Sequence, residues 1–370
     1  MEESIKMDEW LVLLFPVRPE RNSSMAQPGF FDLDNRYESI SKLGDPLEVL
    51  DQAIPWETFR PILSKALRKF RKSNAGRKPY DSVFMFKTLV LQSLYNLSDD
   101  QTEFQIKDRL SFMRFLRLDF EDTVPDAKTL WLFRDTLANK NAIDKLFRKF
   151  NRYLDHEGLF ARQGQLIDAS IVPAPVQRNT REENTNIKQG DVPEDWKEQP
   201  HKLQQKDTDA RWVKKNGRSH YGYKNHVNAD RKHKLIRTFV VTDASVHDSR
   251  VFDSLLDSSN TGKQVFADSA YRSKEINGTL KERGLKNEIH HKGYRGMPLT
   301  EAKQRVNHKR SKVRAAVEHI FGFQQNSLGG KFIRTVGISR ARAKIGLMNL
   351  AYNMKRYVYL TKNKPAHATG

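Results

Sequence analysis

Three acidic residues stand at positions where a carboxylate could perform chemistry. Asp168 interrupts an apolar run, Asp268 ends a second apolar run, and Glu318 lies within a helical segment. A carboxylate in apolar surroundings is costly unless a cation or a hydrogen-bond donor compensates its charge. Several such groups brought together repel one another, and a divalent metal ion or a shared proton relieves that repulsion. The three residues are therefore candidate metal ligands.

The chemistry that these carboxylates predict depends on the metal that they bind. Carboxylates are hard oxygen ligands, and because the chain has no cysteine they favour Mg²⁺ or Mn²⁺ over zinc. Two such ions about 3.5–4 Å apart form a phosphoryl-transfer site, in which one activates the attacking oxygen and the other stabilises the leaving oxygen. A surrounding basic surface would hold a phosphate backbone.

Each carboxylate also has an ordinary structural interpretation. Asp168 could be a structural residue or a strand-end cap, and Asp268 could cap the turn that follows it. Arg314 lies four residues before Glu318, a spacing typical of an exposed helix ion pair worth about 0.3–0.5 kcal/mol. Two other carboxylates rival Glu318 as the third ligand: Glu275 and Glu288.

The composition indicates a globular protein with a polyanionic partner. The chain has 370 residues, 38% of them hydrophobic, which is enough for a core and too much for a disordered polycation. Its net charge of +20 predicts an anionic polymer as partner, with a membrane surface as the lesser alternative. The early apolar run Trp10–Phe15 is too short to span a membrane and follows acidic residues, unlike a signal peptide. We therefore expect a cytoplasmic protein that handles nucleic acid and has no membrane partner.

The positive charge is concentrated in two segments. Residues 201–234 hold ten Lys or Arg against three Asp or Glu, and residues 301–345 hold eleven against two. The first 60 residues are acidic-leaning. This distribution predicts that the C-terminal two thirds of the chain carry the surface that faces the anion.

The apolar pattern predicts a helical region followed by a mixed α/β region. Residues 82–97 are apolar on nearly every side, which indicates a buried helix capped by Asp81. Further helices are expected at 101–118, 129–137, 143–154, 249–256, 273–283, 300–325 and 340–359. Strands are expected at 165–172, 219–228, 235–241, 264–268 and 287–290. The polar, proline-containing segment 173–215 is interpreted as an extended loop inserted between strands.

Seven short motifs follow one another along the chain. In order they are Ile54–Trp56, Gly76–Asp81, Leu166–Pro175, His220–His226, Val246–Asp248, Phe266–Tyr271 and Arg314–Phe321. Together they resemble DDE transposases of the insertion-sequence-five family, and the ordered set is more specific than any single motif. The resemblance runs from about Gln27 to Tyr357.

The resemblance implies a ribonuclease-H-like fold in which Asp168, Asp268 and Glu318 hold two ions of Mg²⁺ (or Mn²⁺). In that family water cuts double-stranded DNA at the inverted-repeat ends of the element, and the freed 3′-hydroxyl attacks target DNA without a covalent protein–DNA intermediate. It further implies a bacterial, nucleoid-associated protein that acts as a homodimer or higher assembly. Two alternatives stay open: a catalytically inactive DNA-binding protein derived from a transposase, and a structure-specific nuclease of the same fold.

The resemblance also implies a division of the chain and shows two departures. Residues 1–24 are interpreted as a dispensable extension, 25–155 as a helical domain for end recognition or dimerisation, and 156–360 as the catalytic domain with its insertion at 173–215. The broader signature has Tyr three residues before the Arg and Lys seven residues after the Glu, where this chain has Ser311 and Gln325.

Basic and aromatic residues near the three acids are candidate DNA contacts. Those at 220, 224 and 226 alternate along one strand, so they share a face and would approach Asp168 if the two strands are neighbours. A solvated strand face is the alternative for these three, and turn capping is the alternative at position 247. The full candidate set is His220, Lys224, His226, His247, Tyr271, Arg272, Lys309, Arg310, Lys312 and Arg314.

Overall fold

The computed structural model describes residues 31–68, 78–260 and 262–362. It divides into two compact units, 1–44 and 45–370. In the first unit, the described helix α1 (Asp32–Lys42) buries none of its residues. The predicted extension 1–24 and the start of the Gly76–Asp81 motif lie outside the described residues. All that follows concerns the second unit.

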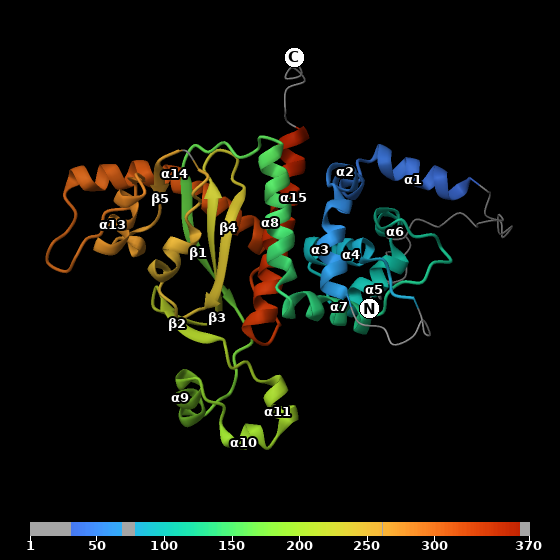
Figure 1. Cartoon of the computed structure of the whole chain (residues 1–370), viewed down its shortest axis with the longest axis horizontal. Coiled ribbons are helices and arrows are strands. Elements are labelled where there is room, and N and C mark those ends of the chain that lie inside the picture. The colour runs from blue at the N-terminus through green and yellow to red at the C-terminus, as the bar shows by residue number, and fades with distance from the viewer. Residues whose placement is uncertain (1–30, 69–77, 261, 363–370) are drawn as a thin grey trace, which may run out of the picture. The chain divides into compact units, whose positions relative to one another are not determined.

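Helices form the first part of this unit (Figure 1), in agreement with the sequence pattern. They are α2 (Pro46–Ala53), the 3-10 helix η1 (Trp56–Phe59), α3 (Arg60–Leu67), α4 (Ser82–Tyr95), α5 (Asp99–Asp108), α6 (Leu110–Leu116), α7 (Ala127–Asn139) and α8 (Ala142–His156). Asp81 caps α4 as predicted, because its Oδ1 accepts hydrogen bonds from the backbone N–H groups of Val83 and Phe84. The single helix predicted over 101–118 is instead two, separated by the extended backbone of Arg109.

A mixed sheet follows the helices and confirms the predicted mixed α/β fold. Its strands are β1 (Gln165–Pro173), β2 (Arg211–Lys215), β3 (Arg218–Asp230), β4 (Ile236–Asp243), β5 (Gln264–Phe266) and β6 (Lys286–Asn287). The order is β2-β3-β1-β5-β6, and β4 also pairs with β3. Strand β1 is central: it runs antiparallel to β3 and parallel to β5.

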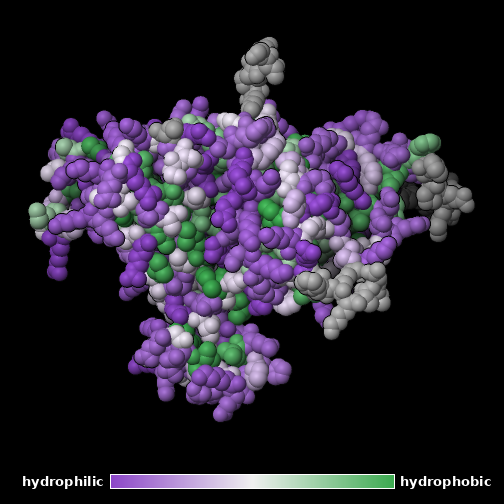
Figure 2. Space-filling view, viewed as in Figure 1, coloured by the Kyte–Doolittle hydropathy of each residue, from purple (hydrophilic) through white to green (hydrophobic). Residues whose placement is uncertain are grey.

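The interpretation of residues 173–215 as an extended loop is wrong. This segment contains α9 (Arg181–Gln189), α10 (Glu194–Lys197) and α11 (Pro200–Gln205), which lie together beyond the end of the sheet in Figure 1, and it also supplies β2. Thr180 and Glu183 form a capping box at the start of α9. The Trp196 side chain is fully buried, and its indole N–H donates to Glu183 Oε1 at 2.7 Å. Proline and polar residues are typical of a loop, so the composition did not indicate these short helices, which contain the buried Trp196 side chain. Figure 2 shows hydrophobic side chains on the visible face of this part of the chain.

The remaining helices cover the two faces of the sheet. They are the 3-10 helices η2 (Asp248–Val251) and η3 (Ser269–Tyr271) and the α-helices α12 (Phe252–Leu255), α13 (Lys274–Glu282), α14 (Glu301–Ser327) and α15 (Ile338–Lys362). One face of β1, marked by Leu166 and Val172, packs into the larger core with α8, α14 and α15, whereas Ile167 packs on the other face against α12 and α13. Side chains of a strand alternate between faces, so this division follows the period of two in β1.

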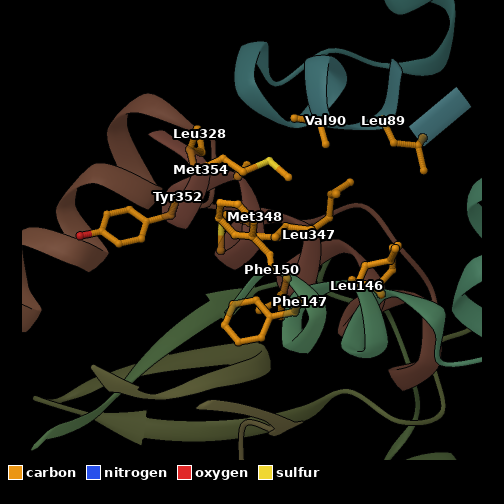
Figure 3. Packing of buried hydrophobic residues seen from close by; sticks show 14 of the residues in the cluster. Leu89, Val90, Leu146, Phe147, Phe150, Leu328, Leu347, Met348, Tyr352 and Met354 are labelled. Atoms are coloured by element: carbon orange, nitrogen blue, oxygen red, sulfur yellow. The ribbon is translucent and has the colours of Figure 1, made fainter. Parts of the chain in front are cut away.

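The large core joins the helical region to the sheet. Figure 3 shows Leu89 and Val90 of α4, Phe147 of α8 and Leu347 of α15 gathered in this cluster. The predicted domain boundary at 155/156 therefore falls between elements that share one hydrophobic core. No helix among the described residues is long and apolar enough to cross a membrane.

A buried amide network fixes α14 against the sheet. Asn349 of α15 accepts hydrogen bonds from Asn225 of β3 at 2.9 Å and from Gln324 of α14 at 2.7 Å. All three side chains are buried. Buried amides that lose a partner are costly, so this network defines one position for α14 over β1.

Candidate active site

Asp168 lies in the middle of β1, on the face that α14 covers. Its side chain is 13% exposed and forms an ion pair with Arg314 of α14, at 2.6 Å between Oδ2 and Nη2. Its other oxygen accepts a hydrogen bond from the backbone N–H of Ala169. The central strand thus presents a carboxylate to the basic helix, and the cation that compensates it comes from far along the chain.

Asp268 lies beside Asp168. Leu166 of β1 pairs in parallel with Phe266 of β5, and the two aspartates each follow two residues later, on the same face. Asp268 also caps η3, because its Oδ1 accepts from the backbone N–H of Ala270 at 2.8 Å. The capping alternative is thereby confirmed, and it leaves the second carboxylate oxygen for other partners.

The environment of the two aspartates opposes a full negative charge. Burial is the largest cause that raises the pKa of Asp168 above its ordinary value; the negative charge of Asp268 raises it further, while Arg314 lowers it. The pair is therefore a place where added positive charge is favourable.

Glu318 lies one helical turn after Arg314, on the same side of α14. Further along this side, Gln325 donates to Ser170 Oγ of β1 at 3.2 Å, so the stripe that carries Glu318 crosses β1. The Glu318 residue is exposed. Among the described residues no three His, Asp or Glu side chains are close enough to hold a metal ion. The structure thus brings two of the three predicted carboxylates together, and the third ligand stays a prediction.

The two rival carboxylates are also placed. Glu288 forms ion pairs with Arg310 at 2.9 Å and with Lys286 at 3.0 Å, so its charge is already compensated. Glu275 lies in the first turn of α13. Neither lies on the stripe of α14 that faces β1.

His290 lies at the edge of the aspartate pair, a position that the sequence did not indicate. Its Nε2 is 3.4 Å from Ser311 Oγ of α14. Burial is the largest cause that lowers its pKa; the positive charge of Arg314 lowers it further and the negative charge of Asp268 raises it. The histidine pair 290–291 has no metal-ligand spacing, and only the return of the chain beside β5 brings His290 to the site.

The candidates Lys224 and His226 point away from Asp168. Strand β3 does adjoin β1, but the register pairs Asp168 with Val227 and Ala169 with His226, so the two candidates lie on the opposite face of the sheet. Both are buried, which excludes the solvated strand face considered from the sequence. His220, near the start of β3, is half-buried.

Lys224 and His226 instead surround Asp248. Lys224 Nζ donates to Asp248 Oδ1 at 2.8 Å and to the carbonyl of Val246 at 2.7 Å. His226 Nδ1 is 4.0 Å from the same carboxylate oxygen, and its Nε2 is 2.9 Å from Thr242 Oγ1. This cluster supports the loop that begins η2.

The buried His226 predicts a pH dependence of stability. Burial is the largest cause that lowers the pKa of His226, from 6.5 to about 4. The negative charge of Asp248 raises this pKa, and the positive charge of Lys224 lowers it further. Between pH 6.5 and 4 the His226 ring is protonated in the unfolded chain but stays neutral in the folded chain. The contribution of the neutral His226 to stability is therefore present above pH 6.5 and is lost as the pH falls towards 4. We expect the free energy of unfolding of the wild type, relative to His226→Gln, to fall by up to about 3 kcal/mol across that interval.

Urea denaturation at several pH values measures this difference. His156→Gln is the matched control, because that ring is 87% exposed. A wild-type curve parallel to that of His226→Gln between pH 6.5 and 4 would contradict the prediction.

The other candidate DNA contacts fall into two groups. Lys309 and Lys312 are exposed on α14 and can reach a ligand. Three further candidates already have structural partners: Arg310 donates to the carbonyl of Ile289 at 2.7 Å, Arg272 donates to the same carbonyl at 3.1 Å, and His247 accepts from the backbone N–H of Ser249. His247 caps η2, which confirms the turn-capping alternative.

Tyr271 is buried directly behind the aspartate pair. Burial, with the negative charges of Asp248, Asp168 and Asp268, raises its pKa well above the ordinary value, so the phenol keeps its proton. Its hydroxyl has no hydrogen-bond partner among the described residues. A direct contact between this ring and DNA would require exposure that the fold does not provide.

Two family models match the chain. Residues 34–136 match a model described as a transposase domain, and residues 160–354, more than half of the chain, match the transposase DDE domain. This chain belongs to the DDE transposase family. A solved structure of the piggyBac transposase synaptic complex with hairpin DNA is also similar, at 12% identity and a TM-score of 0.41, over 88% of this chain and 77% of that one.

The family assignment defines the class of activity. The chain is a DNA transposase by family, and the DDE match covers the three predicted acids of this transposase: Asp168 in β1, Asp268 two residues after β5, and Glu318 in α14. Sequence reasoning found these acids and Arg314, and it missed Ser170 and the place of His290. The contacts of both residues with α14 join segments far apart in the sequence and form only in the folded chain.

Proposed function

We propose that this transposase cuts DNA at the ends of an insertion sequence and joins the freed 3′-hydroxyl to target DNA, as a member of the insertion-sequence-five family. The observation that carries the proposal is the pair Asp168 and Asp268, which lie side by side on one sheet face under the basic helix α14. The motifs at 220–226, 246–248 and 266–271 support the narrower family. The parallel β1–β5 pair beside an antiparallel β3 supports a ribonuclease-H-like catalytic domain.

The residues at the pair fit a hard divalent cation. Both donors are carboxylates, their mutual repulsion favours added positive charge, and one oxygen of Asp268 has no hydrogen bond among the described residues. Asp168 and Asp268 would hold Mg²⁺ or Mn²⁺, with Glu318 as the third ligand. When bound, such ions activate an attacking oxygen and stabilise a leaving oxygen in phosphoryl transfer.

The side chains around the pair would hold and orient the DNA. Lys309 and Lys312, exposed on α14, would contact backbone phosphates. Arg314 compensates the charge of Asp168, and we propose that it turns to a phosphate when a cation takes its place. Lys224 and Asp248 act from the other face as positioning residues for the loop of His247.

Two ends of the element must meet before joining, so we propose that the active form is a homodimer or a higher assembly on DNA. The helical region before β1 would recognise the ends or form the dimer. In support of this role, the described helices α2–α8 precede the catalytic sheet in the sequence.

A joining assay tests the proposed function. The substrates are labelled duplexes that end in the inverted repeats flanking the coding region, offered intact or pre-cleaved together with a target plasmid. We expect Mg²⁺-dependent nicking of the intact end and joining of the pre-cleaved end. Nicking without joining would identify a structure-specific nuclease, and DNA binding without either reaction would identify an inactive DNA-binding protein; each outcome overturns the proposal.

A further inference from the structure

A groove of about 850 Å³ lies between the helical region and the segment that links α14 to α15. Residues of α4, α5 and α7 line it on one side, and residues 329–336 line it on the other. The established family and the carboxylate pair assign nothing to this groove. Its lining combines aromatic rings and positive charges.

Two large aromatic side chains in this groove are exposed. Trp131 of α7 is 44% exposed and Phe332 is 42% exposed. The guanidinium of Arg340 lies 5.6 Å from the centre of the Trp131 ring, while its Nε donates to Asp135 at 2.7 Å. A ring presented between a cation and solvent is a stacking surface for another planar group.

The positive charges of the groove exceed its negative charges. Lys331 and Arg334 are exposed at its edge, and Arg340 and Lys344 line it further in. The Lys344 ammonium has no hydrogen bond or ion pair among the described residues, and burial lowers its pKa to about 8. An anion beside Lys344 would favour its charged form.

The two carboxylates of the groove are already paired. Asp99 accepts from Arg134 at 2.8 Å, and Asp135 accepts from Arg340. Asp99 also raises the pKa of Lys344, but two carboxylates stand against five Lys and Arg side chains in the lining, so the groove presents a net positive surface.

Helix α14 links the groove to the carboxylate pair. Gln325 lines the groove and also donates to Ser170 Oγ, two residues from Asp168 on the same face of β1. Arg314 at the pair and Gln325 at the groove are separated by about 16 Å along the helix, at a rise of about 1.5 Å per residue. A strand of DNA held at the pair can therefore continue into the groove within a few nucleotides.

We propose that this groove binds unpaired DNA next to the cut, with bases on Trp131 and Phe332 and phosphates on Lys331, Arg334 and Lys344. Stacking on an aromatic face requires a base that is free of its own stack, so the ligand is single-stranded DNA rather than duplex. The groove places positive charges around its two exposed aromatic rings, and this combination suits the phosphates and bases of DNA better than a protein segment. The inference rests on the proposed function for its link to cleavage, but binding itself needs no cleavage.

Fluorescence anisotropy with labelled oligothymidylate of about eight nucleotides, within the site sizes of known single-strand binders, tests the proposal in EDTA. The matched variants are Trp131→Ala and Phe332→Ala. We expect each to weaken single-strand binding about tenfold, and Trp131→Phe to restore most of the affinity because a ring is kept. Duplex of the same length should bind the wild type and Trp131→Ala equally.

Exposed aromatic residues elsewhere provide the controls. Trp212 of β2 is 47% exposed and Phe120 is 67% exposed, and neither lines the groove. Trp212→Ala and Phe120→Ala should leave single-strand affinity unchanged. Equal losses in these controls, or unchanged affinity in both groove variants, would overturn the proposal.

A charge readout keeps the test decisive if an aromatic variant folds poorly. Lys331→Gln and Arg334→Gln are exposed substitutions, and each should lower the slope of log affinity against log salt by about 0.7 for single strands. An unchanged salt slope in both Lys331→Gln and Arg334→Gln would contradict the proposal that the groove binds single-stranded DNA. Asp168→Asn should keep single-strand binding, so a failed joining assay and a failed groove assay are distinguishable.

Discussion

Replacement of Asp168 by asparagine should lower Mg²⁺-dependent DNA cleavage at least about a thousandfold, because metal-assisted charge stabilisation contributes several kcal/mol to such a barrier. Asn keeps the shape of the side chain but loses the charge that repels Asp268 and attracts a cation. Affinity for duplex DNA should change little, since exposed lysines of α14 provide the backbone contacts. Nicking of a labelled end, with anisotropy for affinity, measures both.

Loss of the Asp168 charge also affects its partner. Arg314 is 14% exposed and would keep its charge without a partner. Removal of one member of a buried ion pair lowers the free energy of unfolding of a protein by about 3–5 kcal/mol. Melting temperature therefore has to be measured together with cleavage.

Asp268→Asn separates the two effects, because Asp268 caps η3 and leaves the pair of Asp168 with Arg314 intact. Glu318→Gln should also abolish cleavage if Glu318 is the third ligand. Asp253→Asn is the control: this aspartate is 66% exposed and pairs with Arg283 at the surface. Full cleavage by any of the three site variants would remove that residue from the mechanism.

Gly222→Ala should destabilise the protein by about 3–5 kcal/mol. Gly222 of β3 has φ +147°, and an added Cβ would lie 2.4 Å from the carbonyl oxygen of Val172 and 2.7 Å from the backbone N of Ala174. Backbone atoms cannot yield as the end of a flexible side chain can, so β1 and β3 must separate where Pro173 and Gly222 pair. Urea denaturation measures the change.

A second glycine provides a control for the loss of backbone freedom. Gly278 lies inside α13, and a Cβ there would meet no atom within 4 Å. Gly278→Ala should therefore stabilise the protein by about 0.5–1 kcal/mol. Equal changes in the free energy of unfolding for Gly222→Ala and Gly278→Ala would show that the close β1–β3 contact does not exclude a side chain at position 222. Because Asp168 lies on β1, the strand that the added Cβ would displace, a folded Gly222→Ala variant should also cut DNA less efficiently.

Local sequence patterns predicted most helices and strands, because caps and the spacing of apolar residues lie within the element that they define. The cap at Asp81 and the apolar residues after it were sufficient to predict α4, and short runs rich in β-branched or aromatic residues were sufficient to predict β1 and β4. The errors lie where tertiary contacts overrule composition. Trp196 organises helices in a segment whose prolines and polar residues are typical of a loop, and Arg109 ends a helix that the apolar stripe would have continued.

The sequence alone determined the class of the protein, since its ordered motifs and its acids identified a DDE transposase, which the family models confirm. Only the tertiary structure decided which charges meet. The spacing of Arg314 and Glu318 predicted a pair within one helix, but Arg314 binds Asp168, 146 residues away. The register also decided that Lys224 and His226 point away from Asp168, because a shift of one residue exchanges the two faces of a strand and no local pattern reports that shift.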